Sequence, residues 1–445
     1  MILHNIAGIE TIERQTMINV WWRILPLLIV ALFFNYLDKV NIGFAALQMN
    51  KSLGLSNTTF GTAAGLFAIG YLLCGIPSTL LLARFGARRW ISLILVAWGL
   101  CTAATALVSR PHELFGARLL LGAAEAGFTP GVILYFSYWF PSDYRGRTLS
   151  TLLLIQPAGS IIGGPLSAAL LSWDGLAGLA GWKWLFIVEG LPCVLLAYLV
   201  FRFLTDRPAQ ARWLAPHEKQ WLENRLAAEA KTAAAFTPGV TLWKALANKR
   251  LWVLAVVYLG LGTSAVGTLI FLPLIIRSMG YSIWGTGFIS ALPAVATAVT
   301  LPLWGRWTDR SRNRDYVVLI ALCTVAAGSL GAAVLLPSSW ALIPLSLVLI
   351  GFNACLIPFW TLPSEFLTGR RAAVGIAFIN VVGNIGNFTG PTLIGWISDV
   401  TGSYNRALMF MGAIAASTAA LMAVQARSKQ LAEHRATSRC PSPEP

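Results

Sequence analysis

Four charged residues lie deep inside two long apolar segments of the sequence: Asp38 and Lys39 in the first, Arg118 and Glu125 in the second. A charge at the centre of a helix in lipid costs at least about 2.5–3.5 kcal/mol, so each residue requires a partner or a function. Arg118 and Glu125 are seven residues apart and therefore share one helix face. An acid and a base from each segment are expected to converge on one cavity.

These residue types fit the linked binding of an organic anion and protons. Arg118 offers bidentate hydrogen bonds to a carboxylate, and Lys39 offers a compact point charge. Asp38 and Glu125 would neutralise these cations in the empty site. When an anion arrives, the two carboxylates must take up protons or be repelled. The alternative is two interhelical salt bridges that only hold this half of the chain together.

A stripe of amides marks an apolar segment in the second half of the chain. Asn380, Asn384 and Asn387 follow one another at i, i+4 and i+7, which places them on one helix face. Asn384 lies at mid-depth and is expected to contact the substrate, with hydrogen bonding between helices as the alternative. Glu189, in another apolar segment, is interpreted as structural.

Histidine and cysteine provide no sign of catalysis. The four histidines lie in loops or termini, and the cysteines show no CxxC metal spacing. A membrane-embedded enzyme would need a nucleophile–base pair or a metal cluster, and a receptor would need a sizeable sensory domain. We therefore expect a transporter with no catalytic residue, no metal and no cofactor; its coupling ion is expected to be a proton, with sodium as the alternative.

The elements that must position these residues follow from composition and hydropathy. The chain has 445 residues, of which 56% are hydrophobic and 11% charged, whereas a soluble domain has about 25% charged residues. Apolar segments of about 20 residues recur along it. They predict an all-α polytopic membrane protein with twelve transmembrane helices, at 24–44, 60–82, 90–109, 113–138, 149–171, 184–204, 250–273, 284–304, 316–336, 340–361, 374–396 and 405–425.

Basic residues predict the orientation of these helices. Eleven arginines fall in the short loops on one side and five basic residues on the other, so both termini are expected in the cytoplasm, with the chain in the cell inner membrane. This distribution explains the net charge of +15 without a nucleic-acid partner. The predicted parts are a cytoplasmic N-terminus at 1–23, bundles at 24–204 and 249–425, a central loop at 205–248 with a surface helix from Pro216, and a cytoplasmic tail at 426–445.

An internal repeat relates the two bundles. Arg84 and Arg310, Arg145 and Arg371, and the dipeptides Gly164-Pro165 and Gly390-Pro391 are each separated by 226 residues. Three anchors in one register indicate a duplication and therefore two pseudo-symmetric six-helix bundles. Parallel halves of this kind imply a cavity between them near the membrane midplane.

Two loops resemble the G-x-x-x-D-R-x-G-R-R motif of the major facilitator superfamily, LLLARFGARR in the first half and GRWTDRSRNR in the second. The resemblance implies the major facilitator fold and a charge latch at the cytoplasmic helix ends. The first copy has Ala83 where the motif has Asp, which argues against a full latch there. The alternative is that these arginines only determine the orientation of the helices in the membrane. The gating residues implied are Arg84, Gly86, Arg88, Gly305, Asp309 and Arg310.

Four further segments are similar to the anion:cation symporter family within that superfamily: NYLDKVNIGFA, GARLLLGAAEAGFTPGVILYFSYWFP, GWKWLFIVEGLP and DRPAQARWLAPHEKQWLENRL. The resemblance covers nearly the whole chain. It implies that Asp38 and Glu125 act in proton coupling and that Tyr36, Tyr71 and Gln156 line the substrate cavity.

The expected substrate is a small organic carboxylate. The protein is expected to take it up by proton symport, through alternating access of the two halves. Two cations and an amide stripe favour a hydroxylated dicarboxylate such as tartrate. An aromatic monocarboxylate such as 4-hydroxyphenylacetate or nicotinate, or the aromatic acid phthalate, stays open, and drug efflux is a less favoured alternative. The expected partners are the anion and the lipid bilayer, and the chain is expected to act as a monomer.

Overall fold

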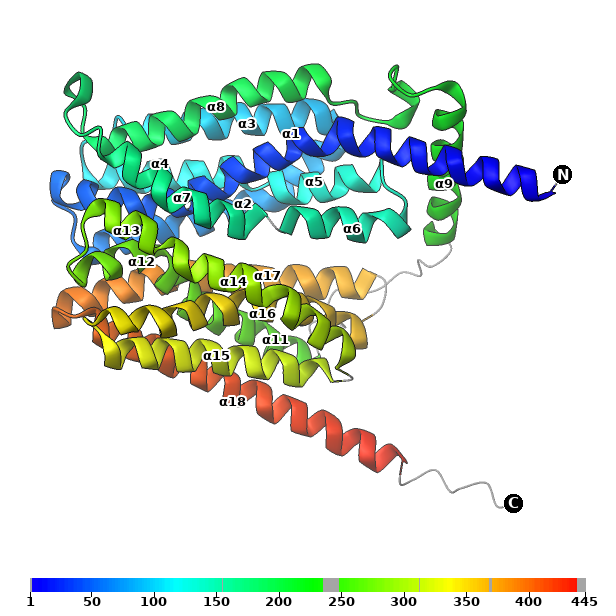
Figure 1. Cartoon of the computed structure of the whole chain (residues 1–445). Helices are drawn as coiled ribbons and strands as arrows, with labels where there is room; N and C mark the ends of the chain where they lie inside the picture. The colour runs from blue at the N-terminus through cyan, green and yellow to red at the C-terminus, as the bar shows by residue number, and fades with distance from the viewer. Residues whose placement is uncertain (1, 154, 235–247, 312, 368–369, 438–445) are drawn as a thin grey trace. The chain divides into compact units, whose positions relative to one another are not determined.

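The computed structural model describes residues 2–153, 155–234, 248–311, 313–367 and 370–437, and these are almost entirely helical, with no strand among them (Figure 1). The chain forms two compact units, which consist of Met1–Gly54 with Leu66–Pro238, and of Leu55–Gly65 with Gly239–Pro445. The all-α class predicted from the apolar segments is confirmed.

The described residues of the first unit form nine α-helices, although the first turns of α2 belong to the second unit. They are α1 (Ile2–Ser52), α2 (Asn57–Phe85), α3 (Ala87–Thr105), α4 (Pro111–Glu125), α5 (Phe128–Ser137), α6 (Ser142–Leu153), α7 (Ile155–Leu171), α8 (Gly181–Phe203) and α9 (Pro216–Ala234).

The second unit contains the remaining named helices and one π-helical turn, Gly262–Val266. The helices are α11 (Lys249–Leu261), α12 (Gly267–Ser278), α13 (Ile283–Ile289), α14 (Ala291–Arg310), α15 (Arg314–Leu335), α16 (Leu342–Phe366), α17 (Arg370–Thr401) and α18 (Tyr404–Thr437).

Each of the twelve predicted spans overlaps these helices, and the fourth, fifth, seventh and eighth are each shared by two of them. Among the described residues, ten segments are long and apolar enough to cross a membrane, and α7 is a shorter apolar helix. The eleventh predicted span lies within α17. Because lipid cannot satisfy backbone polar groups, a chain with these apolar segments must be helical where it crosses the bilayer.

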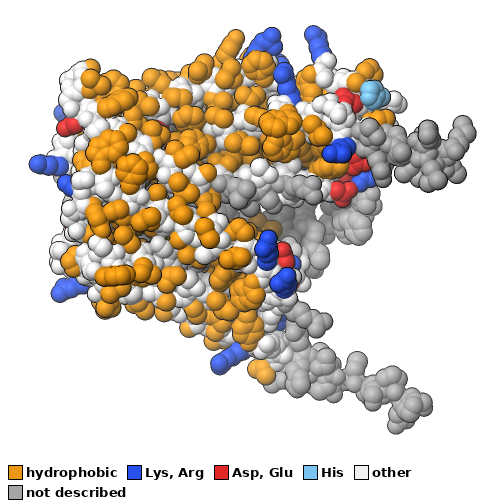
Figure 2. All heavy atoms as spheres, in the orientation of Figure 1, with side chains coloured by type: hydrophobic (Ala, Val, Ile, Leu, Met, Phe, Trp, Pro, Cys, Tyr) orange, Lys and Arg blue, Asp and Glu red, His pale blue; other side chains and the backbone are white. Residues whose placement is uncertain are grey.

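The surface has the composition that lipid exposure requires. Hydrophobic side chains cover most of the face drawn in Figure 2, and the charged side chains gather toward its margins. Leu73, Ile76 and Leu80 on α2 are each about two-thirds exposed. Such an apolar surface would be unstable in water, so it indicates the membrane as the solvent.

Two details of the helices differ from the prediction. The segment preceding the first span is helical, because α1 begins at Ile2 rather than near residue 24. The fourth predicted span is divided at Ala126–Gly127 into α4 and α5. At Gly127 a Cβ atom would lie only 1.8 Å from Ser78 Oγ, so the close approach of α2 requires glycine at this break.

The predicted surface helix of the central loop is confirmed as α9, and it is attached to the first unit. Glu218 is 5% exposed and accepts a hydrogen bond from Asn19 of α1 at 2.9 Å. Glu229 accepts bonds from the backbone N–H and hydroxyl of Ser142, both at 3.0 Å, which caps the N-terminus of α6. This helix therefore ties α1 and α6 together.

The first turns of α2 pack within the second unit. Asp399, near the end of α17, accepts hydrogen bonds from the backbone N–H groups of Asn57 at 3.0 Å and Thr58 at 2.7 Å. Phe60 lies edge-on to Phe271 of α12, with ring centroids 5.2 Å apart. One continuous helix thus contributes its start to the second unit and the rest of its length to the first.

Candidate functional site

Asp38 lies in a buried network of neutral hydrogen-bond donors. Its side chain is 2% exposed, and Oδ1 accepts bonds from Thr102 at 2.9 Å and Asn41 at 3.0 Å, while Oδ2 accepts from Trp98 Nε1 at 3.1 Å. Two of these donors come from α3. Asp38 is therefore held by neutral donors, and it forms no salt bridge with a residue that the structure describes.

Glu125 forms the ion pair between α1 and α4. Its carboxylate is fully buried, and Oε2 lies 3.9 Å from Lys39 Nζ and 2.6 Å from Asn35 Nδ2. Lys39 also donates to Asn35 Oδ1 at 2.8 Å, so the amide bridges acid and base. The predicted convergence of charges from the two segments occurs through this pair. The Lys39 side chain is 35% exposed, which leaves the pair accessible from one side of the unit.

The two carboxyl groups also interact with each other. Both are buried, and Glu125 feels the charge of Asp38. Glu125 Oε1 is buried and has no hydrogen-bond partner among the described residues. Two adjacent carboxylates repel each other strongly in a low dielectric, and a single shared proton supplies the missing donor. The geometry therefore suits one proton held between Asp38 and Glu125.

Arg118 is buried with part of its hydrogen-bonding capacity unfilled. Its side chain is 2% exposed, its Nε and Nη1 atoms have no acceptor among the described residues, and its guanidinium lies 5.3 Å from the centroid of the Phe67 ring. It interacts electrostatically with Asp38 and Glu125 but forms no salt bridge with a residue that the structure describes. The alternative interpretation requires two interhelical salt bridges, whereas among the described residues of this cluster one is formed, between Lys39 and Glu125. The unfilled donors of Arg118 can bind an anion.

The three predicted cavity liners differ in their placement. Tyr71 lies beside the ion pair, with Lys39 Nζ 5.9 Å from its ring centroid. The Tyr36 hydroxyl is hydrogen-bonded to Ser160 of α7 at 2.5 Å. Gln156 is exposed on α7. Only Tyr71 contacts the charged cluster directly among these three.

A third buried carboxyl group, Glu189, continues the network on α8. It is 3% exposed, and its Oε2 atom accepts a hydrogen bond from Asn41 Nδ2 at 2.9 Å. The same nitrogen donates to Asp38. Asn35 and Asn41 were not predicted from the sequence, although their spacing from Asp38, three residues on either side, places all three on adjacent turns of one helix.

The amide stripe of the second unit is present on α17, where its side chains are bonded to one another. Asn384 Nδ2 donates to Asn380 Oδ1 at 2.9 Å, and Asn387 Nδ2 donates to Asn384 Oδ1 at 3.2 Å. These bonds lie within one helix, so they differ from the interhelical bonds of the alternative interpretation. At Gly262, where the π-helical turn begins, a Cβ atom would lie 2.7 Å from Asn387 Oδ1. Such turns are frequent at functional sites.

Comparison with known proteins assigns the family. Residues 28–391 match the sequence model of the Major Facilitator Superfamily. The chain belongs to this superfamily. It is 40% identical over 417 residues to an Agrobacterium vitis protein named "Putative tartrate transporter", covering 94% of this chain and 92% of that one. It is also 40% identical over 410 residues to the "Quinolone resistance transporter" of Acinetobacter baumannii, covering 90% and 93% respectively.

The fold agrees with that assignment. The crystal structure of a bacterial homologue of the human lysosomal transporter Spinster superposes with a TM-score of 0.71 at 18% identity, covering 94% of this chain and 98% of that one. The family resemblance and the twelve-helix, two-bundle fold expected from the sequence are confirmed. The chain is therefore a multi-span membrane transporter of the major facilitator superfamily.

In the first superfamily loop motif, the carboxylate next to Arg88 belongs to a residue outside the motif. Asp206, which follows α8, accepts a hydrogen bond from the backbone N–H of Arg88 at 2.8 Å. Gly86 has a φ of +87°, and a Cβ atom there would lie 2.8 Å from Asp206 Oδ1. Arg84 extends over the adjacent Phe85 ring. A carboxylate therefore lies at the N-terminus of α3, where it interacts favourably with the helix dipole.

The second copy of the motif contributes less to pairing than expected. Asp309 and Arg310 are exposed at the end of α14, and neither makes an ion pair with a residue that the structure describes. A Cβ atom at Gly305 would meet no atom of the described residues within 4 Å. The buried acid near this motif is instead Asp315, which lies 3.3 Å from Arg250 and 2.9 Å from Lys429.

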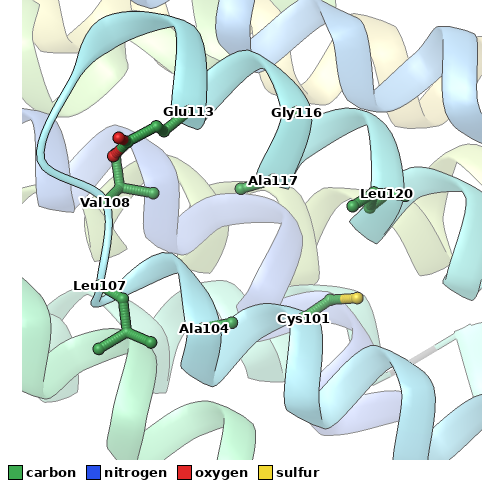
Figure 3. A pocket seen from close by; sticks show the side chains of 8 residues that line it. All are labelled: Cys101, Ala104, Leu107, Val108, Glu113, Gly116, Ala117 and Leu120. Atoms are coloured by element: carbon green, nitrogen blue, oxygen red, sulfur yellow. The ribbon is translucent and has the colours of Figure 1, made fainter.

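A pocket of about 370 Å³ opens between the end of α3 and the start of α4 in this transporter (Figure 3). Its only charged lining residue, Glu113, accepts hydrogen bonds from the backbone N–H groups of Ser109 at 2.8 Å and Arg110 at 3.2 Å. A carboxylate in an apolar lining disfavours an anion. The remaining lining residues are Cys101, Ala104, Leu107, Val108, Gly116, Ala117 and Leu120.

Proposed function

We propose that this transporter is a proton-coupled symporter that takes up a small organic carboxylate by alternating access of its two units. The observation that carries the proposal is Arg118, a buried guanidinium with two nitrogens that lack an acceptor among the described residues, beside the Asp38–Glu125 carboxyl pair. A buried cation without a bonded partner is costly, and an anionic ligand removes that cost.

Lys39 supports the same assignment. It is the partly exposed cation of the group, and its Nζ is 3.9 Å from Glu125. An anion that binds Lys39 competes with Glu125 for its charge. Glu125 then gains stability from a proton, which it can share with Asp38. Anion binding and proton binding therefore favour each other, as symport requires.

Tartrate is the preferred substrate. The two cations, Lys39 and Arg118, suit a dicarboxylate, and a relative at 40% identity carries tartrate in its name. An aromatic carboxylate, with 4-hydroxyphenylacetate, phthalate and nicotinate as examples, is the alternative.

Drug efflux is the second candidate, and one specific observation favours it. A relative at the same 40% identity is named for quinolone resistance. Quinolones are themselves aromatic carboxylates, so Arg118 would recognise the same group in both classes of substrate. The two candidates differ in the direction of transport.

The test is uptake of labelled tartrate, 4-hydroxyphenylacetate and a quinolone into proteoliposomes, with a proton gradient, a sodium gradient or neither. We expect tartrate to accumulate only when the outside is more acidic than the inside. Accumulation driven by sodium alone, or proton-driven extrusion of the quinolone without tartrate uptake, contradicts the proposal. The proposal also includes action as a monomer and a location in the inner membrane with both termini in the cytoplasm. Reporter fusions to both ends test this orientation.

A further inference from the structure

Glu189 on α8 and its partner Asn41 carry an unusual pair of unsatisfied atoms. The Glu189 carboxyl is 3% exposed and receives a hydrogen bond from Asn41 Nδ2 to Oε2. Its other oxygen, Oε1, is buried without a donor among the described residues. Asn41 Oδ1 is likewise buried without a donor from the described part of the chain. The two unsatisfied oxygens therefore belong to the same carboxyl and amide that the existing bond joins.

A proton on Glu189 Oε1 would supply the donor that both atoms lack. A protonated Oε1 is a donor, and Asn41 Oδ1 is the unfilled acceptor of the group already facing Glu189. An acid and an amide joined in this way form two parallel hydrogen bonds, whereas an ionised Glu189 leaves two buried acceptors unfilled. The local hydrogen bonding therefore favours a neutral Glu189.

The charges around Glu189 favour the same state. Asp38 of α1 faces it, and no Lys or Arg forms an ion pair with it among the described residues. Of the other helices packed against α8, α7 carries no ionisable residue and α3 offers the Cys101 thiol near Asp38. Cys193, on α8 itself, donates to the Glu189 backbone carbonyl. Lys39, Arg118 and Glu125 lie around the Lys39–Glu125 ion pair, and none of them bonds to Glu189 among the described residues.

Glu189 is also connected to Asp38. Asn41 Nδ2 donates to Glu189 at 2.9 Å and to Asp38 at 3.0 Å, so these two carboxyl oxygens lie within about 6 Å of each other. One water molecule spans a gap of that size. Glu189 lies in the first half of α8, which begins on the side expected to face outside the cell.

We propose that Glu189 is a further proton-binding residue, which holds a proton and delivers it to Asp38 from the outer side. The O–H bond at Glu189 breaks, an O–H bond forms at Asp38, and the Glu189 carboxylate regains a proton from the outer aqueous phase. This inference rests on the proton-coupled symport proposed above. It assigns a transport role to a residue interpreted as structural from the sequence alone.

The test compares Glu189→Gln, Asn41→Leu and the matched control Glu113→Gln in proteoliposomes. Glutamine keeps the size and the amide pairing of Glu189 but carries no exchangeable acid. We expect Glu189→Gln and Asn41→Leu to slow proton-driven uptake by at least about tenfold, while counterflow exchange persists because it needs no net proton movement. Glu113→Gln should behave as wild type. Wild-type proton-driven rates in Glu189→Gln overturn the inference.

Infrared spectroscopy tests the proton itself, independently of transport. We expect the protonated-carboxyl absorption of the wild-type protein at neutral pH to lose one component in Glu189→Gln, while the component of the Asp38–Glu125 pair persists, and to be unchanged in Glu113→Gln. A wild-type protein without such an absorption overturns the inference even if the variant fails to fold. If the wild-type protein shows the Glu189 component but no proton-driven uptake, the symport proposal fails while the proton site stands.

Discussion

The guanidinium of Arg118 leads to a prediction about affinity. Arg118→Lys keeps the charge but removes the planar set of donors that a carboxylate can bind in pairs. We expect substrate affinity to fall about 10- to 100-fold, the effect of losing one charged hydrogen bond. Substrate titration of the purified protein measures it, and Arg110→Lys, which is exposed just before α4, is the control. Unchanged affinity would show that Arg118 is only structural.

The carboxyl pair leads to a prediction about coupling. Glu125→Gln and Asp38→Asn should both abolish pH-driven accumulation while retaining counterflow, since neither variant can release a proton. Glu125→Gln should fold well, because its new N–H group can donate to Asp38 in place of the unsatisfied Oε1. Asp38→Asn should be less stable, because an amide group would face three donors. Full accumulation in both variants would contradict the coupling assignment.

The sequence located the charged part of the site because charge is costly in lipid. That cost marked Asp38, Lys39, Arg118 and Glu125 as residues in need of a function. Amides, hydroxyls and indoles carry a much smaller cost, so Asn41 and its neighbours in the network were not distinguished from packing residues. The choice of Lys39 rather than Arg118 as the partner of Glu125 depends on how α1 and α4 pack, which spacing within one helix cannot specify.

Helix α9 leads to a prediction about stability. Glu229→Ala removes the cap of α6 and the 3.7 Å ion pair with Arg145. A lost cap costs roughly 1 kcal/mol, and we expect the apparent Tm in detergent to fall by roughly 2–4 °C. Glu223→Ala, on an exposed position of the same helix, is the matched control. An equal effect of both variants would show that the attachment of α9 does not depend on this cap.

The start of α2 leads to a prediction about pH. Partial burial acts to raise the pKa of Asp399, but the hydrogen bonds from Thr58 and Asn57 outweigh it and hold the pKa below its ordinary value. The carboxylate therefore stabilises the helix start above about pH 4, and this contribution is lost as the pH falls through the lowered pKa. Asp399→Asn should lose roughly 1 kcal/mol at neutral pH.

Thermal unfolding of both proteins from neutral to acidic pH measures that difference. The gap between wild type and Asp399→Asn should close as the medium is acidified. A gap that is constant with pH would mean that the charge of Asp399 has no part in capping α2.

The whole molecule divides its chemistry unequally between the units. The buried carboxyl network of Asp38, Glu125 and Glu189 lies in the first unit, whereas α17 of the second offers amides. We therefore expect Asn384→Ala to lower substrate affinity by about 2- to 10-fold and to leave the proton-to-anion ratio unchanged. Reversal-potential measurements give that ratio, with Asn353→Ala on α16 as the control. A changed ratio would show that the second unit also takes part in coupling.

The fold as a whole was predictable because lipid imposes a length and a helical backbone on every span. The interruptions within the helices were not predictable from the sequence. The break at Ala126–Gly127 lies where Gly127 approaches Ser78, and the π-helical turn begins where Gly262 approaches Asn387, both residues far away in the chain. The pattern of apolar residues indicates which surfaces of a helix face lipid, but it does not indicate which neighbouring helix packs closely against it.

The shared helix α2 has a consequence for evolution and for engineering. The duplication places its boundary in the central loop, but residues 55–65 pack with α12 and α17. A chimera that exchanges halves at the central loop would separate these residues from the partners with which they evolved. Substitutions in this short segment should therefore covary with α12 and α17 among relatives, and a working hybrid should inherit residues 55–65 from the parent of its second half.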